Sequence, residues 1–326
     1  MSALVELPIT RCRLTIAAEA PTTLPPFPGP TLRGALGYTL RRLVCATHMP
    51  ACAPCPLRFS CAYPLLFEPF MPPDRPAASR YTRPPTPFML EVPFHSEPFL
   101  RGEELRPLTM APGETLTFGL TIIGPARDHL PYYVYAVMKM ARNGLGGRHQ
   151  PFRLLRVEQL IPQGPRVIYQ EGGKYVEHPP APTMPMPIPI LSSSRLAIRF
   201  VTPARLDLGK DLIYPIEFHH LIQAIRHRVM ALDASYGLLN GFHPDPGLIE
   251  AARSVRRVED RTRWLDLRRY STRQKTPMRI GGAVGIVVYE SEGTFEPFAP
   301  LLALGELLHV GKLASMGLGR LEVNAP

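Results

Sequence analysis

The chain has 326 residues, a length that suits two domains, each large enough to bury a core without disulfide bonds. Hydrophobic residues make up 45% of it, but no apolar run is long enough to cross a bilayer and charges interrupt the first twenty positions, so we expect a cytoplasmic protein that is neither secreted nor membrane-bound. The net charge of +10 suggests a polyanionic partner.

Hydrophobic spacing in the first half predicts the order β-α-β-β-α-β. Alternation of apolar and polar residues indicates a strand, and apolar residues three or four apart indicate a helix. The expected elements are a strand over residues 9–17, a helix over 31–44, strands over 88–94 and 114–123, a helix ending at 143 and a strand over 152–160.

The second half repeats this order. The expected elements are a strand over residues 195–201, a helix over 216–232, a short helix over 246–253, a hairpin of residues 264–272 and 278–289, a helix over 298–309 and a strand over 318–323.

Two β-α-β-β-α-β units predict an α+β protein of two tandem ferredoxin-like domains with antiparallel sheets. The Pro-rich residues 179–193 are expected to link a domain of residues 1–178 to a domain of residues 194–326. The first domain is expected to carry a Cys-rich insertion at residues 45–61.

A Gly-rich turn, residues 311–319, follows the last expected helix. Glycine lets backbone N–H groups approach a phosphate, and flanking basic side chains add positive charge. The alternative is a helix C-cap followed by a tight packing turn. The residues expected to contact RNA phosphate here are Gly311, Lys312, Ser315, Gly317, Gly319 and Arg320.

Residues 253–279 hold ten basic and three acidic side chains, or +7 of the total charge, with Trp264 and Tyr270 interleaved. A basic strand face with aromatic side chains suits RNA, because phosphates give affinity and stacked bases give selectivity. The alternative is a solvated charged face. The chain's basic residues are 32 Arg and 5 Lys, and a GC-rich genome would explain that preference but not the excess of positive charge. The side chains expected to bind RNA are Arg261, Arg263, Arg268, Arg269, Arg273 and Lys275, with Arg33 and Arg41 as further options on the first helix.

Four cysteines lie close together in the sequence. Cys45, Cys52, Cys55 and Cys61 are separated by six, two and five residues, which can supply a tetrahedral zinc site of structural type. An iron–sulfur cluster uses the same ligands, and four reduced thiols in a tight loop are the third alternative. Four thiolates leave no open position for water, so no catalytic metal is expected.

Three blocks of the sequence resemble the CRISPR-associated endoribonucleases of the RAMP superfamily that process precursor CRISPR RNA. They are residues 32–45 with 61–68, residues 264–285, and residues 304–319. The resemblance implies tandem ferredoxin-like domains and cleavage of a CRISPR repeat without a catalytic metal, in the service of antiviral defence. It also implies that CRISPR repeat RNA, as precursor or product, is the partner, together with other CRISPR effector subunits.

In such cleavage a ribose 2′-OH attacks the adjacent phosphate and leaves a 2′,3′-cyclic phosphate and a 5′-OH. The reaction needs a general base, a general acid and a cation. The family places a His near the first helix and a Tyr on it, which here correspond to His48 and Tyr38, with His309 as the alternative. A structural role remains open for both histidines: metal ligation for His48, and contact with the helix dipole for His309.

Two other functions are compatible with the sequence. A non-catalytic subunit that binds CRISPR RNA would show the same Arg-rich hairpin and Gly-rich turn. A metal-dependent nuclease is disfavoured, because no cluster of Asp and Glu suggests a catalytic divalent site.

Overall fold

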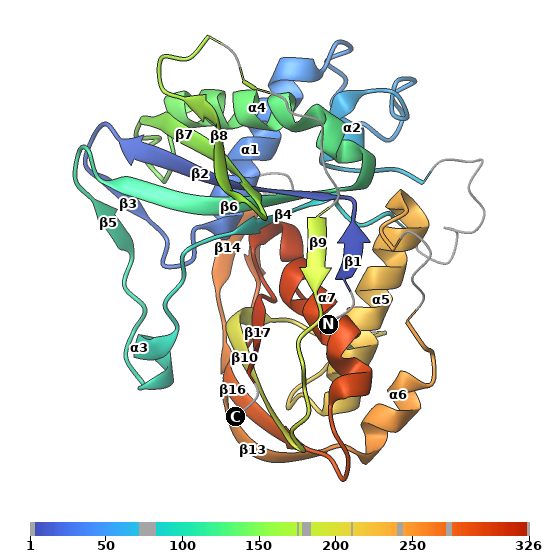
Figure 1. The fold of residues 1–326 in the computed structure, drawn as a ribbon. Coiled ribbons are helices and arrows are strands. Elements are labelled where there is room, and N and C mark those ends of the chain that lie inside the picture. Colours follow the sequence, from blue (N-terminus) through green and yellow to red (C-terminus); the bar gives the residue numbers. More distant parts are fainter. Residues whose placement is uncertain are drawn as a thin grey trace.

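The computed structural model describes residues 4–71, 83–174, 176–177, 184–209, 211–239, 244–271 and 276–324. Figure 1 shows two α/β halves, with the N-terminal half in blue and green and the C-terminal half in yellow and red. Each half is one antiparallel sheet with two main helices on one face, so the expected pair of ferredoxin-like domains is confirmed.

The first half has the strand order β4-β6-β2-β7-β8, in which all neighbours are antiparallel. Leu32, Leu36 and Leu40 bury one stripe of α1 against this sheet. The elements are β2 (Ile9–Ala18), α1 (Gly29–Val44), β4 (Phe88–Glu91), β6 (Thr115–Ile123), α4 (Leu130–Asn143), β7 (Phe152–Ile161) and β8 (Gly164–Gln170), joined by β3 (Thr22–Leu24), α2 (Ala62–Leu66), α3 (Glu97–Leu100), β5 (Leu108–Met110) and the 3₁₀ helix η2 (Gly124–His129).

The second half has the order β13-β16-β10-β17, again antiparallel throughout. Its elements are β10 (Arg195–Ala204), α5 (Phe218–Tyr236), β13 (Arg256–Leu265), β16 (Gly282–Glu290), α7 (Ala299–Leu308) and β17 (Leu321–Asn324), with β11 (Asp207–Leu208), β12 (Asp211–Leu212), α6 (Leu248–Ala251), β14 (Arg268–Ser271), β15 (Thr276–Arg279) and the 3₁₀ helices η3 (Ala252–Ser254), η4 (Glu296–Phe298) and η5 (Ala314–Met316) between them.

The hairpin expected at residues 264–272 and 278–289 is present, but its first arm begins at Arg256, earlier than expected. The long pair is β13 with β16, running from Arg256 opposite Glu290 to Leu265 opposite Gly282, and β14 with β15 forms a separate two-stranded sheet beyond it. The reason is that β13 is an edge strand in which only Leu265 is buried, so it lacks the apolar alternation that identifies a strand.

The two halves share their hydrophobic cores. Met316 and Leu318, which precede β17, lie in the cluster built mainly by the first half, and Met89 and Ile123 lie in the cluster of the second half. The Pro-rich segment also contains a strand, β9 (Met184–Pro187), which pairs with β1 (Leu4–Leu7) beside the sheets (Figure 1). The boundaries at residues 178 and 194 therefore stay a prediction.

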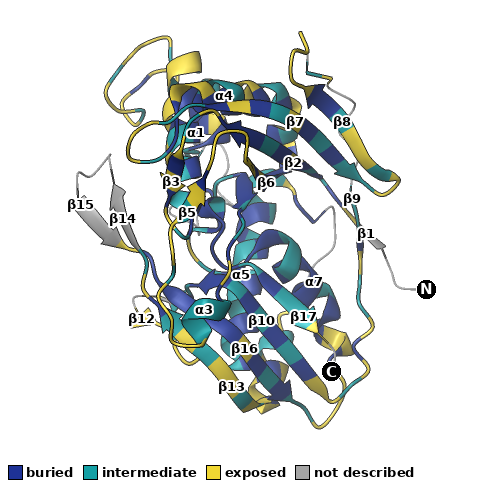
Figure 2. Cartoon of the chain, turned by 90° about the vertical axis from the view of Figure 1, so that its left-hand side faces the viewer, coloured by how far each residue is buried: buried dark blue, intermediate teal, exposed yellow. Residues whose placement is uncertain are grey.

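The open face of the second sheet is partly covered by α3 from the first half. Figure 2 shows α3 in front of β10 and β16. Glu97 of α3 forms an ion pair with Arg199 of β10, and Arg263 of β13 lies over the Phe99 ring at 4.7 Å. Among the described residues, no helix is long and apolar enough to cross a membrane.

Candidate RNA-cleavage site at the domain junction

Helix α1 begins against the Gly-rich turn of the other half. A Cβ at Gly29 would lie 1.8 Å from the carbonyl oxygen of Met316, so only glycine allows this approach. One turn later, Arg33 Nε donates a hydrogen bond to Ser315 Oγ at 2.9 Å. The first helix and the Gly-rich turn, two of the segments predicted to contact RNA, are therefore in direct contact.

The backbone of the Gly-rich turn is used for packing. The N–H of Gly317 donates to Ala314 at 2.8 Å and that of Gly319 to Pro203 at 3.0 Å, and both glycines are buried. Thr202 fixes the same turn, because its hydroxyl donates to the Gly317 carbonyl and accepts from the Arg320 N–H. In this conformation the two N–H groups donate to protein oxygens and are not available to a phosphate. This fits the alternative that the segment is a tight packing turn.

The side chains at the two ends of this turn are more accessible. Lys312 is 57% exposed and pairs with Asp207, whereas Arg320 is 38% exposed and lies 3.6 Å from Glu322. Gly311 is half-buried. Lys312 is thus the most exposed cation of the turn, and its contact with RNA stays a prediction.

His309 is not a candidate for contact with RNA. It is 2% exposed, and its Nδ1–H donates to the Leu318 carbonyl at 3.1 Å. Burial lowers the pKa of His309 to about 4. The proposed alternative catalytic role is therefore corrected to a structural one, in which a neutral imidazole closes the end of α7.

Tyr38 lies on the solvent face of α1 and is 60% exposed. Arg42, one turn later, donates a hydrogen bond from Nη1 to the Tyr38 hydroxyl at 2.8 Å. The guanidinium also lies 5.6 Å from the centre of the Tyr38 ring. The pair offers a hydroxyl and a cation at one accessible position. Sequence analysis missed Arg42, although its spacing of four residues from Tyr38 on a helix was the available signal.

His48 lies on a loop that folds back onto α1. Its side chain is exposed, and its backbone has a φ of 51°. Arg41 anchors this loop, because its Nη2 donates to the carbonyls of Met49 and Pro50, the latter at 3.0 Å. Arg41 is three residues after Tyr38 and directly precedes Arg42, so the loop with His48 is anchored about one helical turn from Tyr38.

The Arg-rich segment is largely neutralised where its side chains are described. Arg256 pairs with Glu290 at 2.8 Å, and Arg257 pairs with both Glu217 and Asp260. Of the predicted RNA-binding residues here, Arg261 is 77% exposed beside Glu259, and Arg263 donates to the Phe99 and Leu100 carbonyls. For Arg268 and Arg269 only the backbone of β14 is described, and Arg273 and Lys275 lie outside the described residues.

A partly buried ionic network joins three neighbouring strands of the first sheet, β2, β4 and β6. Glu91 of β4 accepts two hydrogen bonds from Arg11 Nη2, at 3.1 and 3.2 Å, and one from Thr121. Burial favours the neutral acid, but the charge of Arg11 and its hydrogen bonds hold the pKa of Glu91 below its ordinary value. No sequence signal pointed to this network, since its members are far apart in the chain.

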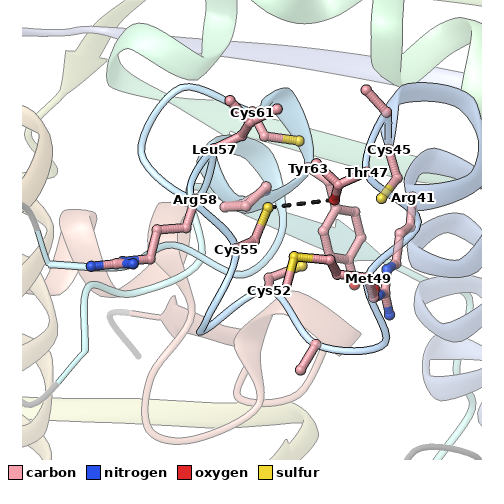
Figure 3. Close-up of a pocket in the computed structure, with 13 residues that line it drawn as sticks. Arg41, Cys45, Thr47, Met49, Cys52, Cys55, Leu57, Arg58, Cys61 and Tyr63 are labelled. Atoms are coloured by element: carbon pink, nitrogen blue, oxygen red, sulfur yellow. Dashed lines mark hydrogen bonds between the residues drawn. The ribbon is translucent and has the colours of Figure 1, made fainter.

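The four clustered cysteines surround one small cavity, together with Arg41, Thr47 and Arg58 (Figure 3). All four are free thiols, and the Thr47 hydroxyl lies 3.5 Å from Cys55 Sγ. Burial would raise the pKa of Cys45, but hydrogen bonds from His48 and Thr47 lower it below its ordinary value.

Comparisons with known proteins agree with this architecture. Residues 7–181 match the AF_1859_N N-terminal domain, and residues 198–321 match the CRISPR-associated endoribonuclease Cas6. A protein of Archaeoglobus fulgidus described as uncharacterized is 22% identical over 305 residues, which cover 93% of each chain.

Two solved structures show the same fold. A Cas6 product complex aligns with a TM-score of 0.54 and 15% identity, over 97% of this chain and 100% of that one. Thermus thermophilus Cas6 aligns with a TM-score of 0.51 and 14% identity, over 99% and 100%. With one domain match over more than half of the chain and a Cas6 match over most of the rest, the chain belongs to the CRISPR Cas6/RAMP-type proteins, with an AF_1859_N domain as its N-terminal half.

Proposed function

We propose that this protein cleaves CRISPR repeat RNA at a single site by attack of a ribose 2′-OH, without a catalytic metal. The products would be a 2′,3′-cyclic phosphate and a 5′-OH. The Cas6 domain match supports processing or binding of CRISPR RNA as the general role. The catalytic proposal rests on the arrangement at the end of α1. There Arg41 anchors the His48 loop beside Arg42, which donates a hydrogen bond to Tyr38.

Each group at this position suits one requirement of the reaction. His48 can accept or donate a proton near neutral pH, which is the role of a general base or acid. The Tyr38 hydroxyl can serve as the second proton carrier, and Arg42 beside it can stabilise charge that develops on the phosphate. All three side chains are exposed, so RNA can reach them.

The remaining cations would hold the RNA. Lys312 and Arg261 are exposed on the second half, and both lie beside single acidic partners that a phosphate can displace. Segment 267–279 adds five basic residues and no acidic one. Phosphate contacts of this kind give affinity but carry no sequence information. The position of cleavage would then depend on which repeat sequence binds in register on this surface.

The test compares cleavage rates of end-labelled repeat RNA by the protein and by two variants under single-turnover conditions. His48→Ala and Tyr38→Phe should each lower the rate by roughly 10²- to 10⁴-fold, the usual size of a general acid–base contribution, with RNA affinity unchanged. Each has a matched control. His149 is also exposed with a φ of 49°, and Tyr135 is also an exposed helical Tyr beside a cation, Lys139.

His149→Ala and Tyr135→Phe should cleave at the original rate. Equal losses in targets and controls would overturn the assignment of His48 and Tyr38.

The burial of His309 also favours a second candidate function, a subunit that binds CRISPR RNA without cutting it, because only one of the two proposed catalytic histidines is then accessible. Binding of the repeat with no cleavage by any preparation would support that candidate.

A further inference from the structure

The loop between α1 and α2 brings its four cysteines to one place. Cys45 ends α1 as its C-cap, and Cys61 begins α2 as its N-cap. Cys52 and Cys55 lie between them, joined by a turn in which the Cys55 N–H donates to the Cys52 carbonyl at 3.1 Å. Figure 3 shows the four side chains around the cavity that they line.

This loop has no hydrophobic core of its own. Its large apolar side chains face solvent, with Leu57 41% and Phe59 39% exposed. Between α1 and α2 the chain makes only turns and bends. Within residues 45–61, Cys52 and Cys61 are the side chains that pack against the core of the first half. A long connection with no regular structure and so little apolar packing needs another source of order, and metal ligation is the usual one in such small units.

We infer that Cys45, Cys52, Cys55 and Cys61 bind one Zn²⁺ ion as a structural site that ties the end of α1 to the start of α2. Zinc favours four thiolates in a tetrahedron, at about 2.3 Å from the metal. Binding exchanges the thiol protons for the ion, so up to four protons leave as four Zn–S bonds form. The inference is independent of RNA cleavage.

The surroundings of the thiols fit a single ion. The cavity has a volume of about 10 Å³, close to the room for one water-sized atom, whereas an iron–sulfur cluster needs much more. Four thiolates around Zn²⁺ carry a net charge of −2, and Arg41 and Arg58 both line the cavity. Thr47 adds a hydroxyl beside Cys55 Sγ. Such charge and hydrogen-bond partners commonly support zinc thiolates.

The thiols are close but not yet a closed set of ligands. Among the described residues, no three His, Cys, Asp or Glu side chains already stand in metal-binding geometry. Closing the site requires side-chain rotation around the cavity, which the turns of this exposed loop permit. The ion would then fix the loop that contains His48.

The test is the metal content of protein purified from zinc-supplemented cells, measured by mass spectrometry together with iron and inorganic sulfide. One zinc per chain is expected, with no iron or sulfide. Cys52→Ser should lose the ion. Cys12→Ala is the matched control, because Cys12 is a buried thiol of β2 outside the cavity, and this variant should keep the zinc.

A spectroscopic measurement covers the case in which Cys52→Ser fails to fold. Replacing zinc by cobalt in the unmodified protein should give the thiolate charge-transfer and strong visible absorption of tetrahedral Co²⁺ with sulfur ligands. Chelation should then expose four reactive thiols and lower the melting temperature. Protein without bound zinc that leaves four thiols reactive from the start overturns the inference, as does protein that contains iron and sulfide.

Discussion

Burial decides which of the candidate residues can act. His48 lies in the loop after α1 and His309 at the end of α7, and both have a positive φ, yet His48 is exposed and His309 is only 2% exposed. Sequence could identify both as candidates, because His is the usual proton carrier. It could not separate them, because His309 is buried among residues that include Glu91 and Arg228, which are distant from it in the chain.

The buried His309 should make stability fall on acidification. Its pKa is about 4 when folded against 6.5 ordinarily, so the unfolded chain binds its proton first as the pH falls. Stability is complete above pH 6.5 and is lost towards pH 4, by roughly 3 kcal/mol. Denaturant unfolding of the protein and of His309→Asn measures this, since Asn tolerates a positive φ and does not titrate.

The difference in unfolding free energy between the original protein and His309→Asn should change by roughly 3 kcal/mol between pH 7 and pH 4. A constant difference over this range would show that His309 does not titrate as a buried neutral group.

Gly319 should be intolerant of any side chain. A Cβ there would lie 1.8 Å from the Val310 carbonyl oxygen, and its φ is 74°. Gly319→Ala should therefore lower the melting temperature far more than Gly172→Ala, which also has a positive φ, of 81°, but open space around it. Equal losses in the two variants would mean that backbone conformation alone, and not the packing of the Gly-rich turn, sets the cost.

At the scale of elements, regular apolar periodicity made most of the fold predictable. Helices α1 and α5 and strands β2, β6 and β10 bury one face along most of their length, so their spacing is visible in the sequence. Helix α7 is buried nearly all round and was visible as a continuous apolar run. Most of the edge strand β13 and the pairing of β1 with β9 were missed. An edge strand exposes most of its side chains, and a pairing across 180 residues leaves no local pattern.

The tip of the Arg-rich hairpin should contribute more to RNA binding than its base. Residues 267–279 carry five basic residues and no acidic one, whereas Arg257 at the base is already paired with Glu217 and Asp260. Replacing both Arg268 and Arg269 by Gln should reduce the slope of log K against log salt by about 1.4, because each phosphate that is no longer neutralised lowers the slope by about 0.7.

Arg257→Gln is the control for this measurement and should leave the slope unchanged, because Arg257 is partly buried and already pairs with two carboxylates, Glu217 and Asp260. A slope that responds equally to both changes would indicate that the whole strand, and not the tip, binds phosphate.

At the scale of the whole molecule, the two ferredoxin-like halves depend on each other. Each contributes buried side chains to the other's core, and α3 of the first half lies on the sheet of the second (Figure 2). The Gly-rich turn is the main meeting point, since it contacts α1 and β4 while its ends join α7 and β17. A rigid junction of this kind can hold the end of α1 in a fixed position relative to the RNA-binding surface of the second half.

The shared cores predict a single cooperative unfolding unit. Leu318 is fully buried in the core of the first half but belongs to the chain of the second. Leu318→Ala should cost about 2–5 kcal/mol, and native-state hydrogen exchange should show the loss equally in the central strands β2 and β10. A loss confined to one of the two strands would show that the halves unfold separately.

The most direct test of the central claim is the chemistry of the RNA ends. The purified protein is mixed with labelled repeat RNA in excess EDTA, with its bound zinc measured in parallel so that loss of a structural ion is not mistaken for loss of a catalytic one. Cleavage at one position, leaving a 2′,3′-cyclic phosphate and a 5′-OH, is the result that we predict. Tight binding without cleavage, or cleavage that requires added divalent metal and leaves a 5′-phosphate, would contradict it.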